Sequence, residues 1–144
     1  MDKSELKALL DKVADGRTGA AEALAQIQSA PVADIGYAQL DLARGVRQGA
    51  GEVVFGQGKT AAQVAGIVDA LVAAGQRHVL VTRLDPQKAA KARALMTCDA
   101  SWDYREDACL AVAGGMPEPS GNGLIVVACA GTSDLPVAEE AALT

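Results

Sequence analysis

Aromatic residues are scarce in this chain of 144 residues, which has one Trp, two Tyr and one Phe. Half of the residues are nevertheless hydrophobic, so a packed core has to be built from Ala, Val, Leu and Ile. This composition favours tightly packed α/β layers and argues against disorder. The length allows one ordinary domain, or one small domain with part of another.

Positive charge is in deficit too, because 13 Lys and Arg stand against 18 Asp and Glu, a formal net charge of -5. Broad nucleic-acid binding needs a basic surface and is excluded, although a local basic cluster is compatible with this balance. No apolar run approaches the roughly 20 residues that span a bilayer. The start, MDKSELKALL, is unlike a secretory signal. We expect a soluble, cytoplasmic protein without nucleic-acid or membrane partners.

Cysteine is used sparingly, and Cys98, Cys109 and Cys129 form no CxxC pair. They stand in apolar or mixed sequence surroundings. This pattern is typical of buried free thiols in a reducing compartment. We expect neither a disulfide framework nor a metal site.

Residues 1–30 are expected to form a helical hairpin. Apolar residues recur at helical spacing between positions 6 and 13, Gly16 then ends the first helix, and a second helix follows from Thr18. Such a hairpin is usually a packing or oligomer element, and less often a partner-docking arm.

Strands and helices alternate between residues 35 and 113. The expected order is an extended segment or strand at 39–42, a strand at 52–55, a helix at 60–74, a strand at 78–82, a helix at 86–95, and strands at 102–105 and 108–113. Lys88, Lys91 and Arg93 of the second of these helices are expected to face water. Together with the hairpin, this order predicts a small α/β sandwich domain over residues 1–113 with some antiparallel pairing.

Residues 114–122, GGMPEPSGN, have the composition of a linker. The uninterrupted apolar run 124–130 then predicts a parallel strand buried on both faces, and a helix is expected from Leu135 or Pro136. Such a strand needs neighbours on both sides. Either it completes the first sheet, or residues 123–144 begin an incomplete second domain of a longer protein, which is the arrangement we expect.

The stretch 52-EVVFGQGKT-60 looks like a phosphate-binding loop. A Walker A loop needs GxxxxGK[ST], and counting back from the GKT places Val53 where the first glycine has to be. The motif therefore fails, and Thr60 with Gln63 fits a capping box that starts a helix. Lys59 keeps two interpretations, a structural turn residue or a contact for a phosphate or carboxylate group.

Arg44 and Arg47 lie three residues apart, on one face if the chain is helical there. Together with Lys59 and Arg83 they are candidates for one anionic substrate site, because arginine forks match phosphate and carboxylate geometry. Arg83 directly follows the strand at 78–82, at the edge where α/β sheets commonly place ligands. Solvated surface arginines are the alternative interpretation.

The stretch 130-AGTSD-134 links the expected buried strand to a helix. Gly131, Thr132 and Ser133 are therefore candidates for binding a phosphate with amides and hydroxyls. Asp134 is a candidate for acid–base catalysis or for a ribose hydroxyl. The alternative is that Ser133 or Asp134 only caps the helix.

Taken together, these stretches resemble the amino-terminal part of the LarB family, the pyridinium-3,5-biscarboxylic acid mononucleotide synthases of lactate racemase nickel-pincer cofactor synthesis. The family is related to the phosphoribosylaminoimidazole (AIR) carboxylase PurE, and some members are labelled circadian phase modifiers. The resemblance is carried by 34-DIGYAQLD-41, 44-RGVRQGAGEVVFGQGKT-60, 80-LVTR-83 and 130-AGTSDLPVAEEAA-142.

The resemblance implies that the α/β domain precedes a PurE-like, flavodoxin-like parallel-sheet domain, here truncated, which forms a homo-oligomer. Family members carboxylate the pyridinium ring of nicotinic acid adenine dinucleotide with CO2 or bicarbonate and hydrolyse its phosphoanhydride, releasing AMP. The resemblance also implies a nucleotide site at Thr132, Ser133 and Asp134. It implies no tightly bound cofactor, and it is compatible with Mg2+ binding together with the substrate. The family's cysteine nucleophile belongs to a later part of that domain, so Cys129 is not expected in this role and the chain alone is expected to be inactive.

Two other classes stay open on the residues alone. One is a non-enzymatic nucleotide-binding or regulatory module that holds a ligand with 130-AGTSD-134 and the basic cluster. The other is an assembly domain whose helical hairpin mediates oligomer contacts.

Overall fold

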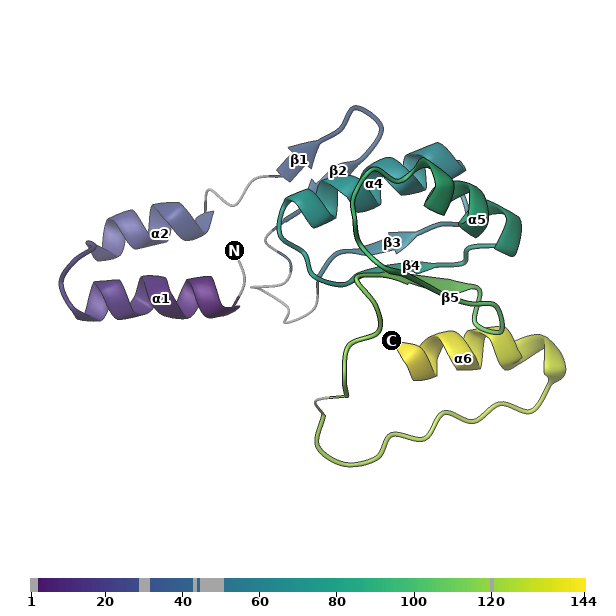
Figure 1. The fold of residues 1–144 in the computed structure, drawn as a ribbon. Coiled ribbons are helices and arrows are strands. Elements are labelled where there is room, and N and C mark those ends of the chain that lie inside the picture. The colour runs from purple at the N-terminus through teal and green to yellow at the C-terminus, as the bar shows by residue number, and fades with distance from the viewer. Residues whose placement is uncertain (1–2, 29–31, 43, 45–50, 120) are drawn as a thin grey trace.

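The computed structural model describes residues 3–28, 32–42, 44, 51–119 and 121–144 (Figure 1). Helices and strands are mixed along the chain, and the main sheet has parallel and antiparallel pairs, so the predicted α/β class is confirmed. None of the helices in the described ranges is long and apolar enough to cross a membrane.

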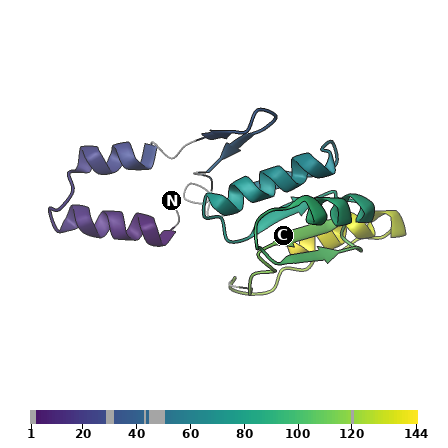
Figure 2. The same ribbon diagram turned by 45° about the horizontal axis from the view of Figure 1, so that its top comes forward.

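Two antiparallel helices, α1 (Lys3–Ala14) and α2 (Ala20–Gln28), form the predicted hairpin (Figure 1). Gly16 ends α1 as predicted, in the left-handed conformation with a φ of 70°. Leu9 and Ala23 are buried where the helices meet. The hairpin projects from the α/β body of the protein in both ribbon views (Figure 2).

A small antiparallel pair, β1 (Val32–Asp34) and β2 (Gln39–Asp41), precedes the main sheet. The sequence indicates only β2, because polar and apolar residues alternate over 39–42, whereas residues 32–34 show no alternation. Leu40 of β2 joins the main hydrophobic cluster. The Tyr37 hydroxyl of the connecting turn lies over Gly66, where a Cβ would collide with it. The pair therefore packs against the helix that carries Gly66.

The main sheet has the order β3 (Val53–Phe55), β4 (Val79–Thr82), β6 (Leu110–Ala113) and β5 (Trp102–Arg105). β3 and β4 are parallel, whereas β4–β6 and β6–β5 are antiparallel. Helix α4 (Ala61–Ala73) joins β3 to β4, and α5 (Pro86–Leu95) leads from β4 toward β5. Both helices cover the same face of the sheet (Figure 2). The predicted strands and helices between residues 52 and 113 are thus confirmed, with shifts of two residues or fewer at their ends.

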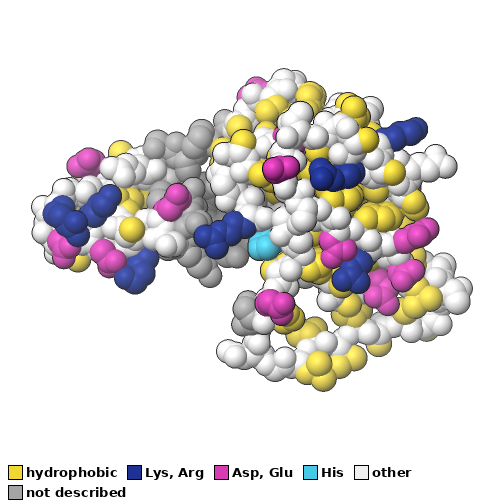
Figure 3. All heavy atoms as spheres, in the orientation of Figure 1, with side chains coloured by type: hydrophobic (Ala, Val, Ile, Leu, Met, Phe, Trp, Pro, Cys, Tyr) yellow, Lys and Arg dark blue, Asp and Glu magenta, His cyan; other side chains and the backbone are white. Residues whose placement is uncertain are grey.

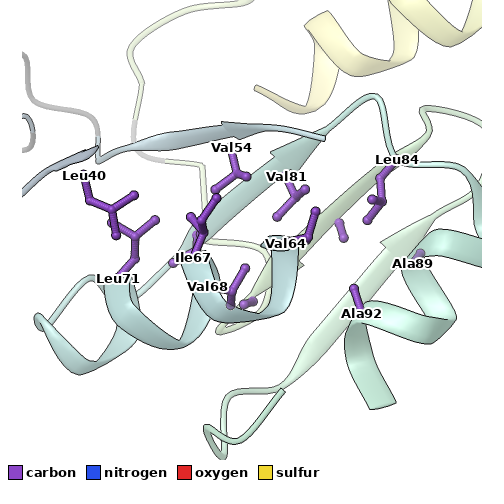
Figure 4. Close-up of a cluster of buried hydrophobic side chains, with 13 residues drawn as sticks. Leu40, Val54, Val64, Ile67, Val68, Leu71, Val81, Leu84, Ala89 and Ala92 are labelled. Atoms are coloured by element: carbon purple, nitrogen blue, oxygen red, sulfur yellow. The ribbon is translucent and has the colours of Figure 1, made fainter. Parts of the chain in front are cut away.

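The main core lies between these helices and the sheet (Figure 4). Helix α4 supplies apolar side chains at helical spacing, so that they share one face. These are Val64, Ile67, Val68 and Leu71, which pack with strand residues such as Val54, Val79 and Val81. The aliphatic core predicted from the scarcity of aromatics is confirmed, since Trp102 and Tyr104 only pack at its margin.

The other face of the sheet carries a second, smaller cluster. Ala108, Leu110 and Val112 are buried there, and Met116 and Leu143 pack against them. Leu143 belongs to α6 (Leu135–Leu143), which follows the short 3-10 helix η1 (Thr132–Asp134). The helix predicted from Leu135 is thus confirmed, and it lies on the side of the sheet away from α4 and α5 (Figure 1).

The prediction of a strand at 124–130 is wrong, because this segment has no regular hydrogen-bonded structure. Leu124 and Ile125 are 87% and 91% exposed. An apolar run forms a buried strand only if neighbouring strands supply hydrogen-bond partners on both sides, and no strand of the described residues lies beside it. Cys129 is accordingly exposed rather than buried, whereas Cys98 and Cys109 are partly buried, and all three are free thiols.

Candidate functional site

The ligand edge expected from the sequence is the carboxyl end of the parallel pair β3–β4. Phe55 and Thr82 are paired residues at this end, and the N–H of Gly56 donates to the carbonyl oxygen of Thr82 at 2.8 Å. A Cβ on Gly56 would lie 2.9 Å from that oxygen, so glycine allows the two following loops to run in contact. Lys59 and Arg83, the cations predicted for this edge, both follow these strand ends.

Both helices that begin at this edge are already capped by side chains. The Oγ1 of Thr60 accepts from the N–H of Gln63 at 3.2 Å and Oε1 of Gln63 accepts from the N–H of Thr60 at 2.9 Å, which confirms the predicted capping box of α4. At α5, Oδ1 of Asp85 accepts from the N–H of Lys88 at 2.8 Å, and this bond is the main cause of a lowered pKa at Asp85. An anion bound here depends on side-chain cations more than on helix amides.

Lys59 presents a charge without a carboxylate partner. Its Nζ donates to the carbonyl oxygen of Phe55 at 3.1 Å, which holds the ammonium group at the end of β3. In the described part of the chain, no Asp or Glu forms an ion pair with it. Lys59 is therefore the candidate cation best placed to accept an outside anion.

Arg83 follows β4 in the left-handed conformation, with a φ of 53°. Its Nε donates to Oε1 of Glu140 in α6 at 3.3 Å and lies 3.0 Å from Oε2. Glu140 is only 18% exposed, and its Oε2 is buried without a hydrogen bond of good geometry, despite the short distance. Arg83 is thus already paired through Nε, and an anionic ligand has to share this guanidinium with Glu140 or replace it.

Lys88 is a part of this edge that the sequence did not reveal, since it was expected to face water. Its Nζ donates to the carbonyl oxygens of Gly56 at 3.2 Å and Gln57 at 3.3 Å, and lies 3.7 Å from Oδ2 of Asp85. Lys88 therefore ties the loop after β3 to the start of α5. The spacing of Asp85 and Lys88 indicates only that these two charges are neighbours, and no local pattern indicates the contacts of Lys88 with residues 56 and 57.

The structure does not bring Arg44 to this edge. Its Nη1 lies 3.8 Å from Oε2 of Glu52, which precedes β3 and so marks the amino end of the strand. Gln76 fixes this end, accepting from the N–H of Glu52 at 3.0 Å and donating to its carbonyl oxygen at 2.9 Å. The grouping of Arg44 with Lys59 and Arg83 in one site is not found, and Arg47 lies outside the described residues.

The segment 131–134 forms a separate, exposed turn before α6. The N–H of Asp134 donates to the carbonyl oxygen of Gly131 at 3.1 Å, and a Cβ on Gly131 would lie 3.4 Å from Oδ2 of Asp134. Neither η1 nor α6 has a side-chain cap, so capping does not explain Thr132, Ser133 and Asp134. Among the described residues, no hydrogen bond or ion pair joins this turn to Lys59 or Arg83.

Tyr104 of β5 contacts the loop after β4 at the same edge of the sheet. This contact makes the stability of the protein fall as the pH becomes strongly alkaline. Its hydroxyl donates to the carbonyl oxygen of Leu84 at 2.8 Å, and burial, with smaller effects of Cys109, Glu106 and Asp85, raises its pKa to about 12. The folded state thus favours neutral Tyr104, so this contribution is complete below the ordinary value near 10 and is lost as pH rises through about 12.

We therefore expect Tyr104→Phe to cost about 1 kcal/mol at neutral pH and to flatten the loss of stability above pH 10. Urea unfolding of both proteins at a series of pH values measures this. Parallel pH profiles up to pH 12 would contradict it.

A family model described as the LarB/PurE-like N-terminal domain matches residues 32–113. The matched range runs from β1 to β6, and it contains Lys59, Arg83 and Lys88 with the loops that hold them. The helical hairpin and residues 131–134 lie outside it. No curated protein matches the chain.

Proposed function

The chain belongs to the family of LarB/PurE-like N-terminal domains, which is related to carboxylases, and on this premise we propose a function in dinucleotide carboxylation. The chain is the amino-terminal part of an enzyme that carboxylates nicotinic acid adenine dinucleotide and hydrolyses its phosphoanhydride. The products are pyridinium-3,5-biscarboxylic acid mononucleotide and AMP. The observation that carries this proposal is the family match over more than half of the chain.

The charges at the carboxyl edge of β3–β4 support a dinucleotide as ligand. Such a substrate carries a pyrophosphate and a carboxylate, and Lys59 has no carboxylate partner among the described residues. Arg83 can exchange the carboxylate of Glu140 for that of the ligand or for a phosphate, because the same guanidinium fork binds both. These side chains bind and orient the substrate in this proposal.

The remaining assignments extend this proposal to residues 131–134. Gly131, Thr132 and Ser133 contribute amides and hydroxyls for a phosphate, and Asp134 contributes a carboxylate for acid–base catalysis. Arg47 is a further substrate contact, and Mg2+ accompanies the pyrophosphate. The chain by itself binds substrate without turnover, and the complete enzyme is a homo-oligomer.

Binding by the 144-residue chain tests the site. We expect Lys59→Ala and Arg83→Ala each to weaken nicotinic acid adenine dinucleotide binding about tenfold or more, since a hydrogen bond to a charged group is worth about 1.5–3 kcal/mol. Isothermal titration calorimetry measures the affinity. Arg93→Ala is the control, because it removes the same charge from an exposed position of α5. Equal affinities of the wild type and the three variants would show that Lys59 and Arg83 do not contact the dinucleotide.

Two further variants separate the site from the reaction. Glu140→Gln is expected to strengthen binding several-fold, since a neutral amide holds Arg83 less tightly. In the complete protein, Asp134→Asn and Arg47→Ala are expected to lower turnover about tenfold, measured as AMP released from the dinucleotide and bicarbonate. Binding without any AMP release by the complete protein would instead support the non-enzymatic ligand-binding module.

A further inference from the structure

Arg83 has a backbone conformation that arginine rarely adopts. Its φ of 53° lies in the left-handed region, where the Cβ of any residue other than glycine crowds the following carbonyl oxygen. Strained residues of this kind persist only where surrounding contacts hold them, and they cluster at binding and catalytic sites. Arg83 follows β4 at the edge that carries the proposed dinucleotide site, so the strain is expected to have a consequence there.

The left-handed turn determines which face of the sheet Arg83 reaches. Side chains alternate along a strand, so an extended residue 83 would share the face of Val79 and Val81, which belong to the core under α4 and α5. Leu84 is fully buried in that core instead (Figure 4). Arg83 bonds Glu140 of α6, which lies on the other side of the sheet (Figure 1). The strain thus keeps the guanidinium out of the core and at the sheet edge.

Two backbone hydrogen bonds hold the peptide groups on either side of Arg83. Before it, the carbonyl oxygen of Thr82 accepts from the N–H of Gly56 at 2.8 Å. After it, the N–H of Leu84 donates to the carbonyl oxygen of Cys109 at 2.8 Å. Cys109 is itself left-handed, with a φ of 47°, so two strained residues lie beyond the last pair of the β4–β6 ladder.

Tyr104 adds a hydrogen bond from a side chain. Its hydroxyl donates to the carbonyl oxygen of Leu84 at 2.8 Å, so Leu84 is held at its N–H, at its carbonyl oxygen and by burial. Figure 3 shows acidic and basic side chains close together over the region of the sheet and α6. An arginine with a freely turning backbone would meet other carboxylates there, whereas Arg83 is directed to Glu140.

We propose that Tyr104 is a positioning residue for Arg83. By holding Leu84, its hydroxyl keeps Arg83 in the left-handed conformation and directs the guanidinium to the edge that also carries Lys59. Tyr104 acts through Arg83 and does not itself contact the ligand. This inference rests on the proposed function in one respect, that the dinucleotide is the anion bound by Arg83.

Tyr104→Phe removes the hydroxyl alone. We expect it to weaken binding of nicotinic acid adenine dinucleotide about three- to tenfold, a factor typical of one lost hydrogen bond, measured by isothermal titration calorimetry. In an Arg83→Ala chain the same change is expected to have no further effect, because Tyr104 acts through Arg83. Equal weakening in both backgrounds overturns the proposal. Lower stability with unchanged affinity also overturns it, since Tyr104 would then be merely structural.

The control Tyr37→Phe removes the hydroxyl of the other tyrosine, which lies over Gly66. It is expected to leave the affinity unchanged. A loss of affinity as large as that of Tyr104→Phe would mean that the effect is not specific to Arg83.

A measurement without ligand separates this inference from the proposed function. In 1H–15N spectra of the free chain at mildly acidic pH, the bond to Glu140 is expected to slow solvent exchange of the Arg83 Nε–H. Tyr104→Phe is expected to speed this exchange several-fold, and Tyr37→Phe is not. Unchanged exchange overturns the positioning role. Faster exchange in a protein that binds no dinucleotide supports the positioning role and contradicts the proposed function.

The strain at residue 83 is tested by Arg83→Gly against Arg83→Ala. Both variants lose the guanidinium, but only alanine bears the steric cost of a left-handed backbone. The glycine variant is expected to have a several-fold higher folded-to-unfolded ratio in urea, despite the greater freedom of glycine in the unfolded chain. A more stable alanine variant would mean that Arg83 is not held in this conformation, and the proposal fails.

Discussion

Replacing Ile67 by alanine is expected to lower the free energy of unfolding by about 3 kcal/mol, within the range of about 2–5 kcal/mol for isoleucine-to-alanine changes in cores. Ile67 is one of the largest fully buried side chains and lies on the face of α4 that packs against the sheet (Figure 4). Alanine removes three carbon atoms from this contact, and the surrounding backbone elements limit how far the core can collapse. Urea unfolding followed by the fluorescence of Trp102, the single tryptophan, measures the change.

Ile67→Val is the matched control, because it removes one carbon atom and keeps the branched shape. It is expected to cost about 0.5–1.5 kcal/mol. Trp102 packs against the same cluster, so its signal reports this core and not the hairpin. Equal losses for the two variants would mean that Ile67 does not fill the core as described.

The second large effect is expected at Gly114, immediately after β6. Its φ is 89°, and an added Cβ would collide with the backbone carbonyl oxygen of Arg77. Its N–H also donates to the carbonyl oxygen of Ser101 at 2.9 Å, which holds it in place. We expect Gly114→Ala to cost about 2–5 kcal/mol, the sum of a left-handed alanine and overpacking against backbone.

Gly75→Ala isolates the first of these two terms. Gly75 has nearly the same φ, 91°, and an added Cβ there meets no atom within 4 Å. It is expected to cost only about 1–2 kcal/mol. The difference between the two variants in urea unfolding then measures the collision with Arg77. A difference near zero would contradict the close approach of β6 to the start of β4.

Much of the α/β domain is determined by local sequence. The capping box of Thr60 and Gln63 begins α4, its apolar residues recur at helical spacing, and Gly75 ends it in the left-handed conformation. In each of these signals the interacting residues are only a few positions apart along the chain, so the local sequence alone shows which residues interact. The same holds for the end of α1 at Gly16 and for the start of α5 at Asp85 and Pro86.

The site is determined less fully by the sequence. The sequence predicts that Lys59 and Arg83 share one edge of the sheet. Two strands joined by a helix are expected to be parallel, and the carboxyl ends of parallel strands lie at the same edge. The pairing of Arg83 with Glu140 joins residues 57 positions apart, and no local pattern encodes it. The separation of Arg44 from Lys59 depends likewise on where the chain enters β3.

The sequence by itself thus determined the helices, their ends, most strands and the aliphatic character of the core, since these depend on neighbours along the chain. Only the tertiary structure decided the order β3–β4–β6–β5, the anchoring role of Lys88 and the exposure of residues 124–127. The apolar run 124–130 shows the physical reason. Its composition favours a strand, but a strand exists only where other strands satisfy its backbone hydrogen bonds, and that depends on segments distant in sequence.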